Sequence, residues 1–124
     1  MKQLLSEITD LFYPRLCIIC NRALMTNERH ICLHCMQQMP QTGYHREPEN
    51  PMEQLFWGSV EIETACAYFF FLPEGAFRHF IHAVKYQGET GAARYIGAQY
   101  ATEILAAGKL GDIDYIIPVP LHPE

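Results

Sequence analysis

The sequence predicts an α+β or α/β chain of two unlike parts, a small cysteine-rich ribbon over residues 1–45 and the first part of an α/β domain over residues 60–124. Three observations support this prediction. Two Cys-x-x-Cys pairs lie close together near the amino terminus. An alternation of apolar and polar residues typical of a strand begins at Val60. Two segments with apolar residues at helical spacing follow, and then a second apolar run. Residues 46–59 are expected to connect the two parts, because they combine prolines, glycine and charged side chains.

The first residues predict a short amphipathic helix. Apolar side chains recur at helical spacing over 4–12, and Pro14 should end the helix near Tyr13, because the residue before a proline is pushed out of the helical region. A helix this short is marginal in water on its own, so we expect it to dock on the ribbon.

The ribbon is predicted from Cys17, Cys20, Cys32 and Cys35, two Cys-x-x-Cys pairs with eleven residues between them. Two cysteines three positions apart can turn both sulfurs toward one point, and two such turns complete a tetrahedron around Zn²⁺. A shell of four sulfurs leaves no position for water or substrate, so the zinc is expected to be structural. A unit this small buries too little apolar surface to fold alone, so the metal should supply much of its folding free energy.

Alternatives to four-cysteine zinc remain open from the sequence: an iron–sulfur centre or another metal, two disulfides, or free thiols. His30 or His34 could replace a cysteine as a ligand, although a solvated side chain is the simpler interpretation of His34. Asn21 follows the first pair, where a left-handed backbone is often needed and Asn is the best substitute for Gly. Cys66 is expected to be a small buried apolar side chain rather than a catalytic thiol.

The α/β part is predicted as strand, helix, helix and strand. The alternation from Val60 predicts a strand that starts half exposed and ends buried at Leu72. A helix of about three turns should then end before Gly88, and a second should span about 91–107. The run 114–120 has the composition of a buried parallel strand. This order opens an α/β sheet, a fold that places its ligand loops at the carboxyl ends of strands.

Charge and hydropathy argue against several classes of function. The sequence has nine basic and fourteen acidic residues, a net charge of −5, which gives no support for DNA or RNA binding. The first residues lack the continuous apolar region of a targeting segment, and the longest apolar stretch, 65–72, is too short to span a membrane. We therefore expect a cytoplasmic protein, a compartment in which paired cysteines are metal ligands more often than disulfides.

Four segments together resemble the amino-terminal part of the competence protein F family, in which a double zinc ribbon precedes a phosphoribosyltransferase-like domain. The segments are LFYPRLCIIC at 11–20, ICLHC at 31–35, AYFFFLPEGAFRHFIHAVKYQG at 67–88 and DYIIPVPLHP at 114–123. Cysteine pairs alone occur in many families, but their order ahead of HAVKYQG and IIPVPLHP is specific. The resemblance implies a type I phosphoribosyltransferase-like α/β domain related to amidophosphoribosyltransferases, and partners in DNA uptake during natural competence.

The resemblance also implies what this chain lacks. In that family's domains, adjacent acidic residues and a Thr/Gly-rich loop hold the ribose phosphate and pyrophosphate groups, and the sequence contains neither. We therefore expect a truncated domain without a complete active site, so that a phosphoribosyl pyrophosphate-like ligand would bind only in the full-length protein. By resemblance, Lys85 and Tyr86 are tentative substrate-binding residues, and no catalytic residue is assigned. The alternative for Lys85 is a solvated cationic face shared with Arg78 and His82.

Three functions follow from the sequence. The first is the inactive front of a phosphoribosyltransferase-like competence protein, and the second is a zinc-ribbon module that docks a protein or nucleic-acid partner. The third is a small self-sufficient metalloenzyme. Under the first, an incomplete sheet leaves apolar edges open, so we expect the α/β part to self-associate.

Overall fold

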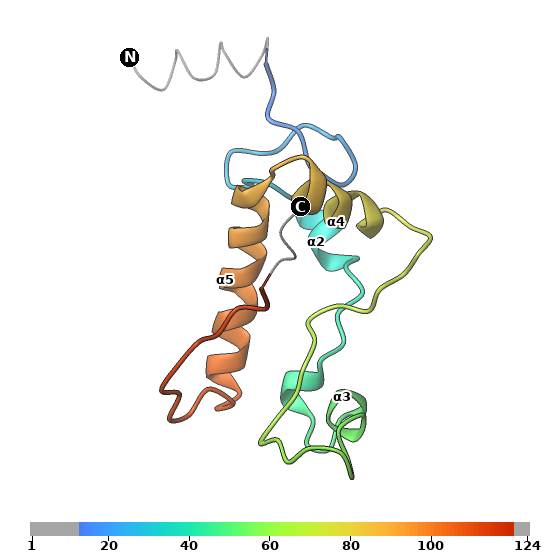
Figure 1. The fold of residues 1–124 in the computed structure, drawn as a ribbon. Helices are drawn as coiled ribbons and strands as arrows, with labels where there is room; N and C mark the ends of the chain where they lie inside the picture. The colour runs from blue at the N-terminus through green and yellow to red at the C-terminus, as the bar shows by residue number, and fades with distance from the viewer. Residues whose placement is uncertain (1–12, 121–124) are drawn as a thin grey trace.

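The computed structural model describes residues 13–120, and the regular secondary structure of these residues is almost entirely helical. In chain order it contains α2 (Leu33–Gln37), the 3₁₀ turn η1 (Tyr44–Arg46), α3 (Pro51–Gln54), α4 (Phe77–Tyr86) and α5 (Thr90–Ala106). Figure 1 shows α5 running along the molecule, with α2 and α4 beside its first turns and α3 near its far end. The helix predicted over 4–12 lies outside the described residues.

Helices α4 and α5 confirm the two helices predicted from apolar spacing. α4 buries Phe77, Phe80 and Ala83 along one face, and Gly88 follows its end with a φ of 72°. α5 ends in the same way ahead of Gly108, whose φ is 68°. Glycine adopts this left-handed backbone without steric cost, so both stop signals act as the sequence predicts.

One hydrophobic core joins the cysteine-rich ribbon to α4 and α5. The ribbon contributes Ile19, Ile31 and Met39 together with buried cysteines, and α5 contributes Ala92 and Ile96. From α4, two phenylalanines stack with ring centroids 5.4 Å apart. Burying a side chain of this size is worth about 1.5–3 kcal/mol, so the ribbon and the helices stabilise each other. The division into domains at residues 45 and 60 stays a prediction.

The prediction of two strands needs correction. Within residues 13–120 the β pairing is limited to isolated antiparallel bridges, Leu16 with Ala23 and Gln41 with Phe69. The second bridge has two backbone hydrogen bonds, from Thr42 to Tyr68 and from Phe70 to Pro40. Residues 60–67 and 114–120 have no strand partner in this part of the chain, and a strand without a neighbour gains no ladder hydrogen bonds. The end of the first segment is also exposed rather than buried, since Phe71 is 69% exposed.

The expected connector is partly folded around the side chain of Asn50, which is 2% exposed. Its Oδ1 caps α3 by accepting hydrogen bonds from the N–H groups of Met52 at 2.9 Å and Glu53 at 3.1 Å. Its Nδ2 donates to the carbonyl oxygens of Ala65 at 2.9 Å and Tyr44 at 3.2 Å. One amide therefore fastens α3 to the segments on both sides of it.

We expect Asn50→Ala to lower the free energy of unfolding by about 2 kcal/mol, because it removes a helix cap and the amide donor to the carbonyl of Ala65. Asn50→Asp keeps the capping oxygen but loses the amide donors, so its loss should be smaller. Urea unfolding of the zinc-bound chain measures both variants. An alanine variant as stable as the wild type would contradict this role for Asn50.

No helix within residues 13–120 has the length and apolar character that crossing a bilayer requires.

Candidate metal centre

The four predicted cysteine ligands come together at one point within the ribbon. Their Sγ atoms all lie within 4.8 Å of one another, and the Sγ atoms of Cys20 and Cys32 are 3.7 Å apart. A tetrahedral shell with Zn–S bonds near 2.3 Å places its sulfurs about 3.8 Å apart. A disulfide would need about 2.05 Å, so the spacing fits a four-sulfur metal site.

Backbone hydrogen bonds shape the first cysteine turn. The N–H of Asn21 donates to the carbonyl of Cys17 at 2.8 Å, and the N–H of Cys17 donates to the carbonyl of Arg22 at 2.8 Å. Asn21 has a φ of 57°, which confirms the left-handed position predicted after the pair. The tight turn therefore directs both sulfurs of the pair to the same side.

Helix α2 shapes the second cysteine turn. Cys32 is the N-cap of α2, and its Sγ accepts a hydrogen bond from the N–H of Cys35 at 3.5 Å. The N–H of Cys32 donates in turn to the Sγ of Cys17 at 3.4 Å. These N–H···S contacts stabilise negative charge on sulfur, which a metal-binding thiolate carries.

Glu28 holds the start of α2 in place, a role that the sequence analysis missed. Its carboxylate accepts from the N–H of Leu33 at 2.7 Å and from the N–H of Met25 at 2.8 Å. The N–H groups of Leu33 and Met25 also lower the pKa of Glu28. The sequence feature that could have predicted this role of Glu28 is its place a few residues before the cysteine pair at which a helix begins.

The cysteines differ in how readily they lose a proton. Burial raises the pKa of Cys17, but the N–H groups of Cys20, Cys32 and Ile19 outweigh it and lower that pKa to about 7. Burial raises the pKa of Cys32 and of Cys35, and for Cys35 the neighbouring sulfurs raise it further. Four thiolates this close repel one another, so the cluster needs a cation, and Zn²⁺ supplies the charge.

Neither histidine near the ribbon belongs to the ligand cluster of the described residues. His34 is exposed on α2, as the simpler interpretation of the sequence predicts. The ring of His30 lies against the start of α5, where a Cβ added at Gly91 would come within 2.8 Å of its Cε1. Gly91 therefore leaves room for His30 to pack against the helix. The ring centroids of His30 and Tyr95 are 6.2 Å apart.

The structure places the other predicted site residues away from the metal centre. Lys85 and Tyr86 lie on the last turn of α4, and both are exposed. The Tyr86 ring contacts that of His82, with centroids 5.0 Å apart. Cys66, expected to be buried in a strand, is half-buried in an irregular segment instead.

A polar cluster around Glu103 of α5 was not predicted. Its Oε1 accepts a hydrogen bond from the hydroxyl of Tyr68 at 2.7 Å, and its Oε2 accepts from Arg46 at 2.9 Å. The Nε2 of His45, a residue only 2% exposed, lies 3.2 Å from the same Oε2. The ring of Tyr100 packs edge-on against His45, with centroids 5.5 Å apart. This cluster fastens η1 and the segment at Tyr68 to α5.

We expect Asn21→Ala to weaken zinc binding about fivefold, because a left-handed alanine costs about 1 kcal/mol and metal binding is coupled to folding. Asn21→Gly should bind zinc as the wild type does, since glycine adopts this backbone freely. Competition with a chromophoric chelator measures the affinity. Equal affinities of the alanine and glycine variants would refute the backbone explanation.

Comparisons with known proteins agree with this geometry for the first third of the chain. Residues 8–46 match the family described as the double zinc ribbon domain, and the match includes all four cysteines. A search of curated proteins and a search of solved structures each found no match. The amino-terminal part of this chain is thus a zinc ribbon, in which Cys17, Cys20, Cys32 and Cys35 form a cluster able to bind a structural zinc ion.

Proposed function

We propose that this chain is the amino-terminal part of a phosphoribosyltransferase-like protein of the competence protein F family, with the zinc ribbon as its non-catalytic structural module. The cluster of four cysteines is the observation that carries the structural role. Four sulfurs within 4.8 Å of one another can fill all four positions of a tetrahedral zinc ion, which would leave no ligand position for a substrate; Cys17, Cys32 and Cys35 are buried and Cys20 is exposed. The family assignment is supported by the order of the cysteine pairs, HAVKYQG and IIPVPLHP along the chain.

In this proposal the ribbon holds α4 in position. Phe77 and Phe80 of α4 share a core with Ile19 and Met39 of the ribbon, so the helix that carries HAVKYQG rests on the metal unit. Lys85, at the exposed end of α4, would then approach a phosphate-bearing ligand in a full-length protein of this family. The competence role, in the uptake or processing of DNA, comes with the family proposal.

Titration with phosphoribosyl pyrophosphate and Mg²⁺, followed by calorimetry, tests the proposal. We expect no saturable binding to this chain, because it has no adjacent acidic pair and no Thr/Gly-rich loop. We expect a full-length member of the family to bind, and its affinity to fall when the lysine that matches Lys85 is replaced by alanine. Saturable binding to this chain, or no effect of the lysine variant, would contradict the proposal.

A docking role is the second candidate, favoured by the number of apolar side chains that the structure leaves in solvent. Leu55 is 73% exposed and Trp57 60%, both beside α3. Exposed apolar patches on a folded chain mark interaction surfaces. The net charge of −5 favours a protein partner over a nucleic acid.

We also expect the chain to self-associate through its last described segment. Tyr115, Ile116, Ile117 and Val119 are each 84–90% exposed, although their composition is that of a buried strand. Sedimentation velocity should show dimers or larger species that dissociate when Ile116 and Val119 are replaced by Lys. A monodisperse monomer at all concentrations would contradict this expectation.

A further inference from the structure

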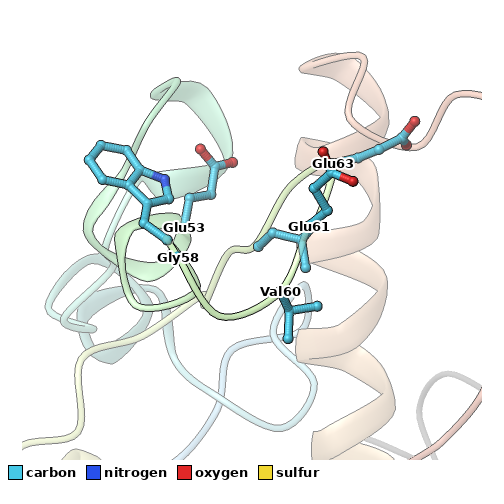
Figure 2. Close-up of a pocket in the computed structure, with 7 residues that line it drawn as sticks. Glu53, Gly58, Val60, Glu61 and Glu63 are labelled. Carbon is cyan, nitrogen blue, oxygen red and sulfur yellow. The ribbon is translucent and has the colours of Figure 1, made fainter.

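A pocket beside α3 belongs neither to the metal centre nor to the proposed phosphoribosyl site. It lies between the end of α3 and the irregular segment that follows, and its volume is about 320 Å³. Figure 2 shows Glu53 on one side and Glu61 and Glu63 on the other, with Val60 at the edge. The lining residues are Glu53, Trp57, Gly58, Val60, Glu61, Ile62 and Glu63.

The pocket is negatively charged. Residues 47–63 contain five glutamates and neither Lys nor Arg. Glu61 and Glu63 are exposed, and neither has an ion-pair partner among the described residues 13–120. Such a surface attracts a cationic side chain and repels the phosphates of a nucleic acid.

Glu53 already holds one cation at the wall of this pocket. Its Oε1 accepts a hydrogen bond from the hydroxyl of Thr64 at 2.7 Å and lies 3.8 Å from the Nζ of Lys109. The side chain of Glu53 is only 12% exposed, so its position is fixed by these contacts. Lys109 therefore neutralises Glu53, whereas Glu61 and Glu63 at the open side stay available.

The apolar part of the pocket is unusually exposed for its residue types. Trp57 is 60% exposed, Val60 61% and Ile62 38%. An indole face attracts Lys or Arg side chains through its quadrupole, and apolar neighbours bury the methylene groups of these side chains. Aromatic side chains are also over-represented among residues that dominate protein interfaces.

We propose that this pocket docks a basic segment of a partner protein. A Lys or Arg side chain of the partner enters between Trp57 and the carboxylates of Glu61 and Glu63, and an apolar neighbour covers Val60 and Ile62. The partner is identified by its chemistry, positive charge next to an apolar side chain. This inference does not depend on the phosphoribosyltransferase assignment.

The chain contains a single tryptophan, so Trp57 reports directly on the pocket. The zinc-bound full chain is titrated with a synthetic peptide of alternating arginine and leucine, while the indole N–H resonance of Trp57 is followed by NMR. We expect a saturable shift that weakens in roughly 0.5 M salt, where charges are screened beyond a few ångströms. A peptide of alternating glutamate and leucine should cause no saturable shift.

Two double variants locate the binding. The double variant Glu61→Gln, Glu63→Gln should weaken binding of the arginine–leucine peptide about fivefold. The control variant Glu74→Gln, Glu89→Gln removes the same amount of charge from positions just before α4 and α5, and it should leave the peptide affinity unchanged. The proposal is overturned if both variants weaken binding equally, if both peptides shift Trp57 alike, or if neither peptide gives a saturable shift.

Discussion

Chelation of zinc under reducing conditions is expected to unfold the ribbon and to remove much of the helical circular-dichroism signal. Structural zinc sites contribute on the order of 10 kcal/mol to folding, more than a unit of this size gains from its core. The helical signal should fall because Ile19, Ile31 and Met39 of the ribbon share one core with α4 and α5. Without the ribbon, the buried faces of both helices would be open to water.

Cys32→Ser and Cys66→Ser make a matched pair for this experiment. Cys32 is 4% exposed and belongs to the four-sulfur cluster, whereas Cys66 lies outside it. We expect the Cys32 variant to lose both its zinc and its folded structure, and the Cys66 variant to keep both. A chain that stays folded after chelation, or a Cys66 variant that fails like the Cys32 variant, would show that zinc does not hold the ribbon.

Replacement of Glu103 by Ala should lower the free energy of unfolding by about 3 kcal/mol. The change leaves the hydroxyl of Tyr68 and the buried ring of His45 without the carboxylate that faces them. Burial raises the pKa of Tyr68, and the hydrogen bond to Glu103 raises it further, so the hydroxyl stays a donor at neutral pH. Urea unfolding of the zinc-bound variant measures the loss.

Arg46→Ala distinguishes the contribution of the buried contacts in this cluster from that of its exposed ion pair. Arg46 pairs with the same carboxylate, but its side chain is 69% exposed, and exposed ion pairs are worth about 0–1 kcal/mol. We therefore expect this variant to cost less than 1 kcal/mol. If Arg46→Ala costs as much as Glu103→Ala, the surface pair and not the buried contacts stabilises the cluster.

The features that the sequence predicts well are those with local causes. The spacing of each cysteine pair defines its own turn, and Asn21 takes the left-handed backbone that the turn needs. Helices α4 and α5 follow from apolar spacing and from Gly88 and Gly108 beyond their ends. In each case the deciding interactions join residues only a few positions apart.

The features that could not be predicted depend on residues far apart in the chain. The contact between Arg46 and Glu103 spans 57 positions, and the hydrogen bond from Asn50 to Ala65 spans 15. No periodicity marks such pairs. The prediction of two strands was wrong for the same reason. An alternation of apolar residues indicates that one face of a strand could be buried, but it does not identify the neighbouring strand with which it must pair.

X-ray absorption at the zinc edge, made on the purified chain together with metal analysis, tests the central claim most directly. We predict one zinc per chain, surrounded by four sulfur atoms at about 2.3 Å with no nitrogen ligand. This result would assign the site to Cys17, Cys20, Cys32 and Cys35, whose sulfurs the structure places within 4.8 Å of one another. A zinc-free folded chain, or a shell that includes histidine nitrogen, would contradict the four-cysteine structural site.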